Sequence, residues 1–193
     1  MAREFLANQF GLYGDNPFRP HDIEQALLAL LAVGVFWFLD RRKPGLNADR
    51  GTFGYVVVWV QYFFGIHALE SGLNFFLNPE AQPIMEQVNA SQFQFHMTEM
   101  GLFAVVKVIE VTVGLCLVLN VFVPLAAILE MPISVIICYL SVFIVAGPRQ
   151  LWTGPKELIC NALLLFAYWG YFRDLFRSHT RWKPVWRTWG EMK

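Results

Sequence analysis

The sequence predicts an all-α fold, a polytopic membrane helical bundle, and three observations lead to this prediction. Hydrophobic residues make up 56% of the 193 residues, and the mean hydropathy is +0.43. Charged residues make up only 16%, whereas a soluble domain carries about 25%. The charges cluster between long apolar windows. This distribution is typical of helices that satisfy their own backbone hydrogen bonds in lipid.

The apolar windows predict the membrane spans, because a crossing helix needs at least about 17 residues. In chain order the expected spans are 23–40, 54–77, 98–120, 124–146 and 157–173. The polar stretch 78–97 and the Gly-Pro-bracketed segment 147–156 are expected as loops. Pro124 suits the first turn of the fourth helix, and Glu157 suits the start of the fifth, at the positive end of the helix dipole.

These spans divide the chain into three parts. Residues 1–53 hold an N-terminal segment, the first span and a basic loop. Residues 54–175 form a four-helix membrane bundle, and residues 176–193 form a tail. The first apolar stretch begins late and ends in basic residues, so the N-terminal segment is expected to be retained rather than cleaved as a signal peptide.

Basic residues predict how the chain is oriented. Arg41, Arg42 and Lys43 follow the first span, and the segment 173–193 is also rich in Lys and Arg. Such residues mark the cytoplasmic side. The C-terminus is therefore expected in the cytoplasm and the N-terminus outside, in the bacterial inner membrane. The formal net charge is zero and gives no indication of a nucleic-acid partner. The expected partners are the lipid bilayer and other membrane protein subunits.

The tail has its own pattern. Trp182, Trp186 and Trp189 recur at spacings of four and three, which places them on one stripe of a helix, while Arg181 and Arg187 lie largely off that stripe. This predicts an amphipathic segment on the cytoplasmic leaflet. A docking surface for a partner protein is the alternative interpretation.

Two pairs of ionisable residues lie inside otherwise apolar spans. His67 and Glu70 are three residues apart, and so are Lys107 and Glu110, so each pair shares one helix face. An ionisable group in a span normally faces the bundle interior and finds a partner. These four are the candidate catalytic residues. We expect them to form one polar seam between the second and third spans, with a structural role favoured over a catalytic one.

The chemical alternatives depend on the residue types. His67 titrates near neutral pH, so with Glu70 setting its tautomer it is suited to quinone or proton chemistry. Asn74, Glu110 and Glu130 are candidate cofactor-binding residues, and a quinone or a lipid is the expected ligand. No metal or autonomous haem site is expected, because His67 is the single histidine predicted inside a span and a metal site needs a complete ligand set.

Two segments resemble known membrane proteins. The run from Phe63 to Phe76, with its Ser-Gly-Leu-Asn motif, is similar to the first helix of DoxX-like membrane proteins. The run from Lys107 to Ala127 resembles that family's second helix, turn and third-helix start. The resemblance covers about residues 55–175 and implies a four-helix bundle, to which an N-terminal span and a Trp-rich tail are added. It extends to Ser71, Gly72, Leu73, Asn74, Glu110 and Gly114, and not to His67, Glu70 or Lys107.

The resemblance implies little about activity, because many DoxX-like proteins have no assigned role. Some DoxX-like proteins are similar to membrane subunits of thiosulfate:quinone oxidoreductases, and others accompany redox or assembly systems. We therefore expect an accessory or anchor subunit of a larger redox or energy-converting complex, without autonomous activity. The alternative is a quinone-linked oxidoreductase subunit with a buried polar site. A small-solute transporter is a third class, which the apparent lack of an inverted repeat and of broken helices disfavours.

Overall fold

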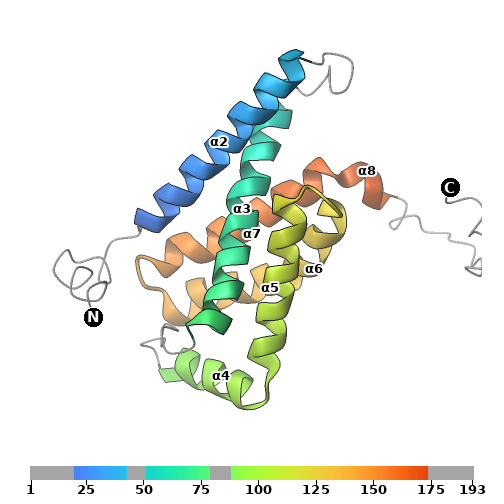
Figure 1. Ribbon diagram of the computed structural model, residues 1–193. Coiled ribbons are helices and arrows are strands. Elements are labelled where there is room, and N and C mark those ends of the chain that lie inside the picture. Colours follow the sequence, from blue (N-terminus) through green and yellow to red (C-terminus); the bar gives the residue numbers. More distant parts are fainter. Residues whose placement is uncertain (1–19, 43–50, 79–87, 174–193) are drawn as a thin grey trace, which may run out of the picture.

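The computed structural model describes residues 20–42, 51–78 and 88–173, and within these ranges the regular elements are all helical (Figure 1). The predicted all-α bundle is thus confirmed. The elements are α2 (Pro20–Arg42), α3 (Gly51–Leu77), α4 (Val88–Glu99), α5 (Leu102–Val118), α6 (Val123–Tyr139), the π-helical η2 (Leu140–Val145), α7 (Gln150–Ala167) and α8 (Trp169–Phe172).

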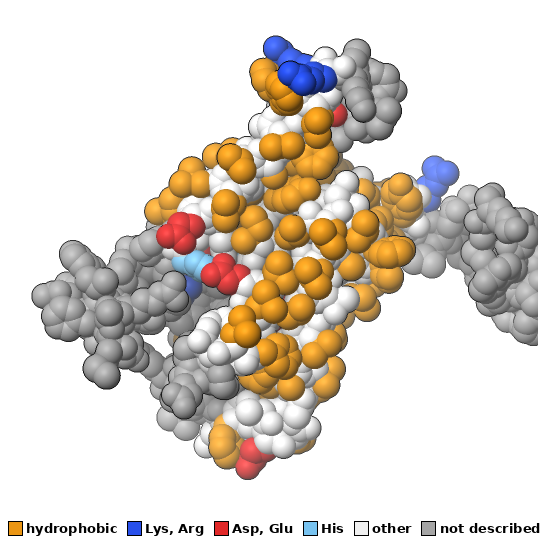
Figure 2. All heavy atoms as spheres, viewed as in Figure 1, with side chains coloured by type: hydrophobic (Ala, Val, Ile, Leu, Met, Phe, Trp, Pro, Cys, Tyr) orange, Lys and Arg blue, Asp and Glu red, His pale blue; other side chains and the backbone are white. Residues whose placement is uncertain are grey.

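Three helical segments are long and apolar enough to cross a membrane: His21–Arg42, Gly51–Leu77 and Val123–Val145. Large hydrophobic side chains lie exposed along them, including Leu31 at 70% and Phe143 at 71%. Hydrophobic side chains also cover most of the face shown in Figure 2. Exposed apolar surface of this extent is expected where lipid is the solvent. The chain is therefore an integral membrane protein whose helices contact the bilayer.

The predicted third span is broken. Residues 92–99 and Leu102–Val118 are together long and apolar enough for one span. The two helices are, however, bent by 88° at the residues between them. Gly101 has φ +71° there, a conformation that glycine adopts without steric cost. Part of the expected loop 78–97 is thus the helix α4. The bend is itself a break in a helix. The expected absence of broken helices therefore no longer counts against a transporter.

The predicted fifth span begins in a different place. Helix α7 starts at Gln150 rather than Glu157, and Pro155 lies inside it. Pro155 is the sixth residue of the helix, so it removes one hydrogen bond between an N–H and the carbonyl four residues earlier, and α7 continues past it. The early start brings the polar residues Lys156, Glu157 and Asn161 into the helix, where they are buried. Among the described residues, α7 is not one of the candidate spans, so five crossings are not established.

Helix α3 is central and packs against α2, α5 and α7 (Figure 1). Its contact with α5 is close because glycines face the neighbouring helix. A Cβ atom on Gly65 would lie 2.7 Å from Leu117 Cβ, and one on Gly114 would lie 2.5 Å from the backbone nitrogen of Leu69. Small residues allow transmembrane helices to approach in this way.

The turn between α5 and α6 is as tight as the sequence predicts. Asn120 and Phe122 have φ values of 56° and 51°, and proline occupies the first turn of α6. From this turn α6 runs on through η2, and α7 then returns beside it (Figure 1). The core between these helices contains Val113, Leu117 and Leu164, each 0% exposed.

Candidate functional site

Many polar side chains are buried inside this apolar bundle. Those below about one tenth exposure are Asp22, Gln25, Gln61, Lys107, Glu110, Glu130, Ser134, Ser141, Lys156, Glu157 and Asn161. A charged side chain in the membrane interior costs at least about 2.5 kcal/mol by insertion scales, and such residues normally mark functional paths or paired contacts. This group, with His67, is the candidate site.

His67 lies at the centre of the site. Its Nε2 atom is 3.0 Å from Oε1 of Glu157 on α7, and its Nδ1 atom is 3.2 Å from Oε1 of Gln25 on α2. An amide oxygen only accepts hydrogen bonds, so Nδ1 carries a hydrogen. The contact with Glu157 then needs one further proton, carried either by the imidazole or by the carboxyl group. The His67–Glu157 pair therefore holds a proton that can move between two atoms.

Gln25 links this pair to the protein surface. Its Nε2 atom donates to Oε2 of Glu70 at 3.1 Å and lies 2.9 Å from Nε2 of His21. His21 and Glu70 are themselves 2.9 Å apart, and their side chains are 41% and 46% exposed. Because a carboxylate accepts hydrogen bonds, Glu70 holds the amide nitrogen of Gln25. The amide oxygen of Gln25 is then the atom that faces His67. The hydrogen bonds thus run without a break from exposed groups to a buried one.

The predicted contact between His67 and Glu70 is replaced by this arrangement. Gln25 lies between the two side chains, and Glu157, rather than Glu70, contacts the second ring nitrogen. Glu70 is also the most exposed member of the predicted seam. Its side chain meets α2 because residues 20–25 form the first turns of that helix beside it.

The second predicted pair is present. Nζ of Lys107 donates to both carboxylate oxygens of Glu110, at 2.7 and 3.0 Å, and to Oγ of Ser71 at 2.9 Å. The Lys107 and Glu110 side chains are 10% and 6% exposed. A polar contact therefore joins α3 to α5, as expected, but Ser71 makes it and Glu70 does not. The predicted single seam is thus two separate groups of contacts.

Another buried ion pair joins α2 to α7. Nζ of Lys156 on α7 lies 2.8 Å from Oδ1 of Asp22 on α2, and both side chains are at most 10% exposed. Lys156 also lies 5.3 Å from the ring centroid of Phe63. This pair holds the start of α2 against α7, next to the His67–Glu157 pair.

Glu130 on α6 connects these groups electrostatically. The residue is 3% exposed, and among the described residues its Oε2 atom has no hydrogen-bond partner. The charges of Glu110, Glu157 and Lys107 all act on its carboxyl group. The site therefore extends over α2, α3, α5, α6 and α7, with one carboxyl oxygen left unsatisfied inside it.

The remaining predicted site residues lie elsewhere. Asn74 is exposed near the end of α3, where its Oδ1 atom accepts a hydrogen bond from Asn78, so it is separate from the buried group. The tail residues Trp182, Trp186, Trp189, Arg181 and Arg187 lie outside the described residues. No group of three or more His, Cys, Asp or Glu side chains within the described ranges is arranged to hold a metal ion.

The sequence reasoning missed eight residues of the site, and four of them make the contacts around His67 and the ion pair described above: Asp22, Gln25, Lys156 and Glu157. Asp22 and Gln25 have the same three-residue spacing as the two predicted pairs, so this signal was present. Gln25 is uncharged, however, and Asp22 precedes the predicted first span. The sequence placed Lys156 in the loop 147–156 and Glu157 at the start of the fifth span, with no partner for either.

The fold and the site define the class of this protein: an integral membrane helical bundle with buried, hydrogen-bonded ionisable groups. No family model matches the chain, and no curated protein or solved structure shows significant similarity to it.

Proposed function

We propose that this protein is a membrane-embedded subunit of a larger redox or energy-converting complex, and that its buried network exchanges protons inside the bundle. One observation carries the proposal. Hydrogen bonds join the half-buried His21 and the exposed Glu70 to Gln25, and Gln25 to the partly buried His67, which contacts the buried Glu157. A histidine in contact with a carboxyl group is suited to taking up and releasing a proton near neutral pH.

The charges of the buried groups support this proposal. Lys107 offsets Glu110, and Lys156 offsets Asp22. Among the buried groups of the site described above, Glu130 and Glu157 are then left with His67, which becomes positive when it takes up a proton. Since a net buried charge is costly, one proton shared by His67 and Glu157 and another on Glu130 would leave these three groups neutral. A group of this composition stores protons.

A test of the anchor role uses the native complex. The chain is purified from its own membranes in a mild detergent, and its mass is measured with partners retained. We expect it to run with at least one larger protein, because the proposed anchor role requires a partner that carries the redox centres. A chain that runs alone would refute the anchor role.

The alternative is a quinone-linked oxidoreductase subunit, and the movable proton of the His67–Glu157 pair favours it, because quinone reduction consumes protons. In the native complex, quinone reductase activity is compared between the unaltered protein, His67→Ala and Glu110→Gln. His96→Ala is the matched control, since His96 is exposed on α4 and contacts Glu99. Activity that both site variants leave unchanged would exclude this alternative.

We also propose the orientation with the C-terminus in the cytoplasm of a bacterial cell, and α7 as a fifth, polar-lined crossing. Phe53 at the start of α3 contacts Phe166 at the end of α7, with ring centroids 6.4 Å apart. The start of α7 meets the other end of α2 through Asp22. Both contacts support a helix that runs the length of the bundle and ends on the side of the basic loop.

A reporter experiment tests this orientation. Green fluorescent protein, which fluoresces in the cytoplasm, and alkaline phosphatase, which is active outside it, are each fused after residue 193. Fluorescence without phosphatase activity is the expected result. The opposite pattern would show that the C-terminus lies outside the cytoplasm.

A further inference from the structure

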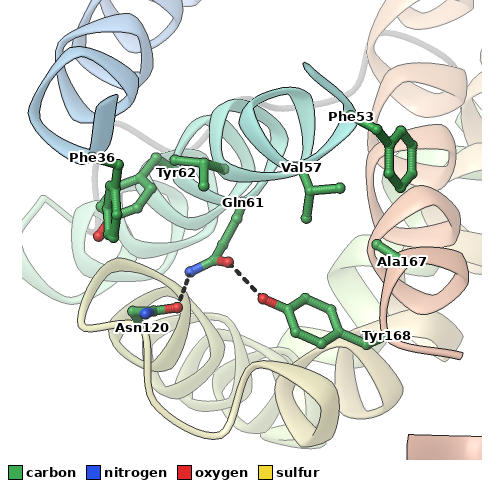
Figure 3. Close-up of a pocket in the computed structure, with 10 residues that line it drawn as sticks. Phe36, Phe53, Val57, Gln61, Tyr62, Asn120, Ala167 and Tyr168 are labelled. Atoms are coloured by element: carbon green, nitrogen blue, oxygen red, sulfur yellow. Dashed lines mark hydrogen bonds between the residues drawn. The ribbon is translucent and has the colours of Figure 1, made fainter. Parts of the chain in front are cut away.

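A pocket lies at the opposite end of α3 from His21 and Glu70, and the proposed function does not use it. Its volume is about 300 Å³, at the lower end of the range for small-molecule sites, which is about 300–1,000 Å³. Residues from α2, α3, the turn after α5 and the end of α7 line it (Figure 3). Along α3, Gln61 in this pocket is about 9 Å from His67 at the helical rise of 1.5 Å per residue.

The polar part of the pocket is rigidly held. Gln61 is 2% exposed, and its Nε2 atom donates to the Leu117 carbonyl at 2.9 Å and to Asn120 Oδ1 at 3.0 Å. Its Oε1 atom accepts a hydrogen bond from the Tyr168 hydroxyl at 3.2 Å. Figure 3 shows Gln61 between Asn120 and Tyr168. The hydrogen bond from Gln61 thus holds the Asn120 side chain by its amide oxygen, Oδ1.

The Asn120 amide nitrogen is the donor that remains. Among the described residues, no hydrogen bond is donated by Nδ2 of Asn120, although the nitrogen carries two hydrogens. Asn120 is exposed and adopts a positive φ of 56° in the turn after α5. The turn therefore presents the amide N–H groups of Asn120 at the pocket, while Gln61 holds the amide oxygen of the same side chain.

The other walls are apolar and aromatic. Phe36 and Tyr62 pack with ring centroids 5.8 Å apart on one side, and Phe53, which is 53% exposed, lies on the other side (Figure 3). Val57 between them is buried. Apolar walls with a few fixed polar groups are typical of sites for small molecules.

The position of the pocket indicates where its ligand comes from. The nearby end of α2 carries Arg41 and Arg42, whose guanidinium groups lie 4.0 and 4.3 Å from the ring centroids of Trp37 and Phe38. Arginines paired with aromatic rings are typical of the depth of the lipid headgroups. A molecule dissolved in the bilayer can thus bring its polar end to this pocket while its chain stays in lipid.

We propose that this pocket binds the polar end of a membrane-soluble molecule that carries a carbonyl oxygen. The Asn120 amide donates to that oxygen, and the rings of Phe36, Tyr62 and Phe53 enclose the adjoining apolar part. A quinone ring and the ester of a phospholipid both have this chemistry. The proposal goes beyond the proposed function, because it requires neither a redox partner nor proton exchange at His67.

The test has one arm for each source. The full chain is reconstituted in phosphatidylcholine nanodiscs, and saturable binding of a decyl-substituted benzoquinone is measured. In parallel, the phospholipid that stays bound through detergent delipidation is measured by mass spectrometry. We expect Asn120→Leu to weaken binding about fivefold in one arm, which is the effect of one lost hydrogen bond. The arm that responds identifies the source.

Two further variants fill the pocket from different helices. Val57→Trp acts from α3 and Ala167→Phe from α7, and each is expected to remove saturable binding or lipid retention. Asn78→Leu, at the far end of α3, is the matched control. Thermal unfolding shows which variants are folded, and either folded pocket-filling variant suffices. Binding and retention that stay at the unaltered level in a folded filling variant and in Asn120→Leu would overturn the proposal.

Discussion

At the scale of single residues, the Lys107–Glu110 pair illustrates how buried charges depend on each other. Both side chains are at most 10% exposed, and they contact each other directly. Replacing one partner leaves the other charge without compensation, which costs about 3–5 kcal/mol in buried pairs. Replacing both with apolar residues removes the desolvation penalty as well.

We therefore predict that Lys107→Met lowers the thermal unfolding midpoint in detergent strongly, by about 6 °C or more, since about 1 kcal/mol corresponds to about 2–4 °C in a protein of this size. The double variant Lys107→Met/Glu110→Leu is expected to recover most of that loss. A double variant as unstable as the single one would show that Lys107 stabilises the bundle by something other than its pairing with Glu110.

Glu130 leads to the opposite prediction. Its Oε2 atom has no hydrogen-bond partner among the described residues, and two further carboxyl groups act on it. Glu130→Gln keeps the shape of the side chain and cannot ionise. We expect the thermal midpoint to rise by about 2–4 °C, which is the effect of about 1 kcal/mol. Glu99→Gln, at an exposed position of α4, is the control without an expected change. A clear fall in the midpoint of Glu130→Gln would contradict this reasoning.

At the scale of the elements, the closest contact is the one between α3 and α5. A Cβ atom on Gly114 would lie 2.5 Å from the nitrogen of Leu69 and 2.7 Å from its Cα atom. These are backbone atoms, so one helix has to move. We expect Gly114→Ala to destabilise the protein by about 1–3 kcal/mol, the cost of overpacking, in detergent unfolding. Gly34→Ala is the matched control, because no heavy atom lies within 4 Å of its added carbon.

Helix α2 is attached to the bundle in a different way. Many of its leucines face outward, among them Leu27, Leu28 and Leu30 at 52–60% exposure, and lipid solvates them as well as protein does. Polar contacts hold its inner face: Asp22 with Lys156, Gln25 with His67, and the Ala26 carbonyl with the Trp59 ring nitrogen at 3.2 Å. The position of α2 is thus set mainly by side chains that are few and polar.

Helix boundaries show how far the sequence could be read. The ends of α2, of α3 and of α6 continued through η2 follow from apolar length and from Pro124, so they were predictable to within a few residues, whereas the change from α-helix to π-helix at Leu140 was not predicted. The break at Gly101 and the early start of α7 were not, because both depend on tertiary contacts. Gly101 fits a continuous helix as well as a broken one, and the buried Lys156 pairs with Asp22, which lies far away in the sequence.

The same limit applies to the site. Periodicity could indicate that Lys107 and Glu110 touch, since both lie on one helix. It could not indicate that Glu157 reaches His67, ninety positions away, because long-range pairing depends on how the helices cross. Residues of a membrane site that come from different helices need the structure to be found.

At the scale of the whole molecule, α2 can be treated as a separate piece. We predict that residues 51–193, expressed without residues 1–50, are degraded or inactive, because Lys156 and His67 lose Asp22 and Gln25. Co-expression of residues 1–50 as a second chain is expected to restore a stable complex, measured by co-purification. The same piece with Asp22→Ala and Gln25→Leu should fail. Equal recovery with the altered piece would show that apolar packing is sufficient.

The Asp22–Lys156 contact also has a consequence for biosynthesis. Its two residues are 134 positions apart, and at the usual elongation rate of about 5–20 residues per second the ribosome needs about 7–27 s to make that length. During this interval α2 has already left the ribosome, and its acidic residue lacks the lysine that balances it in the finished bundle. The start of α2 therefore enters the membrane before the lysine that pairs with Asp22 has been made.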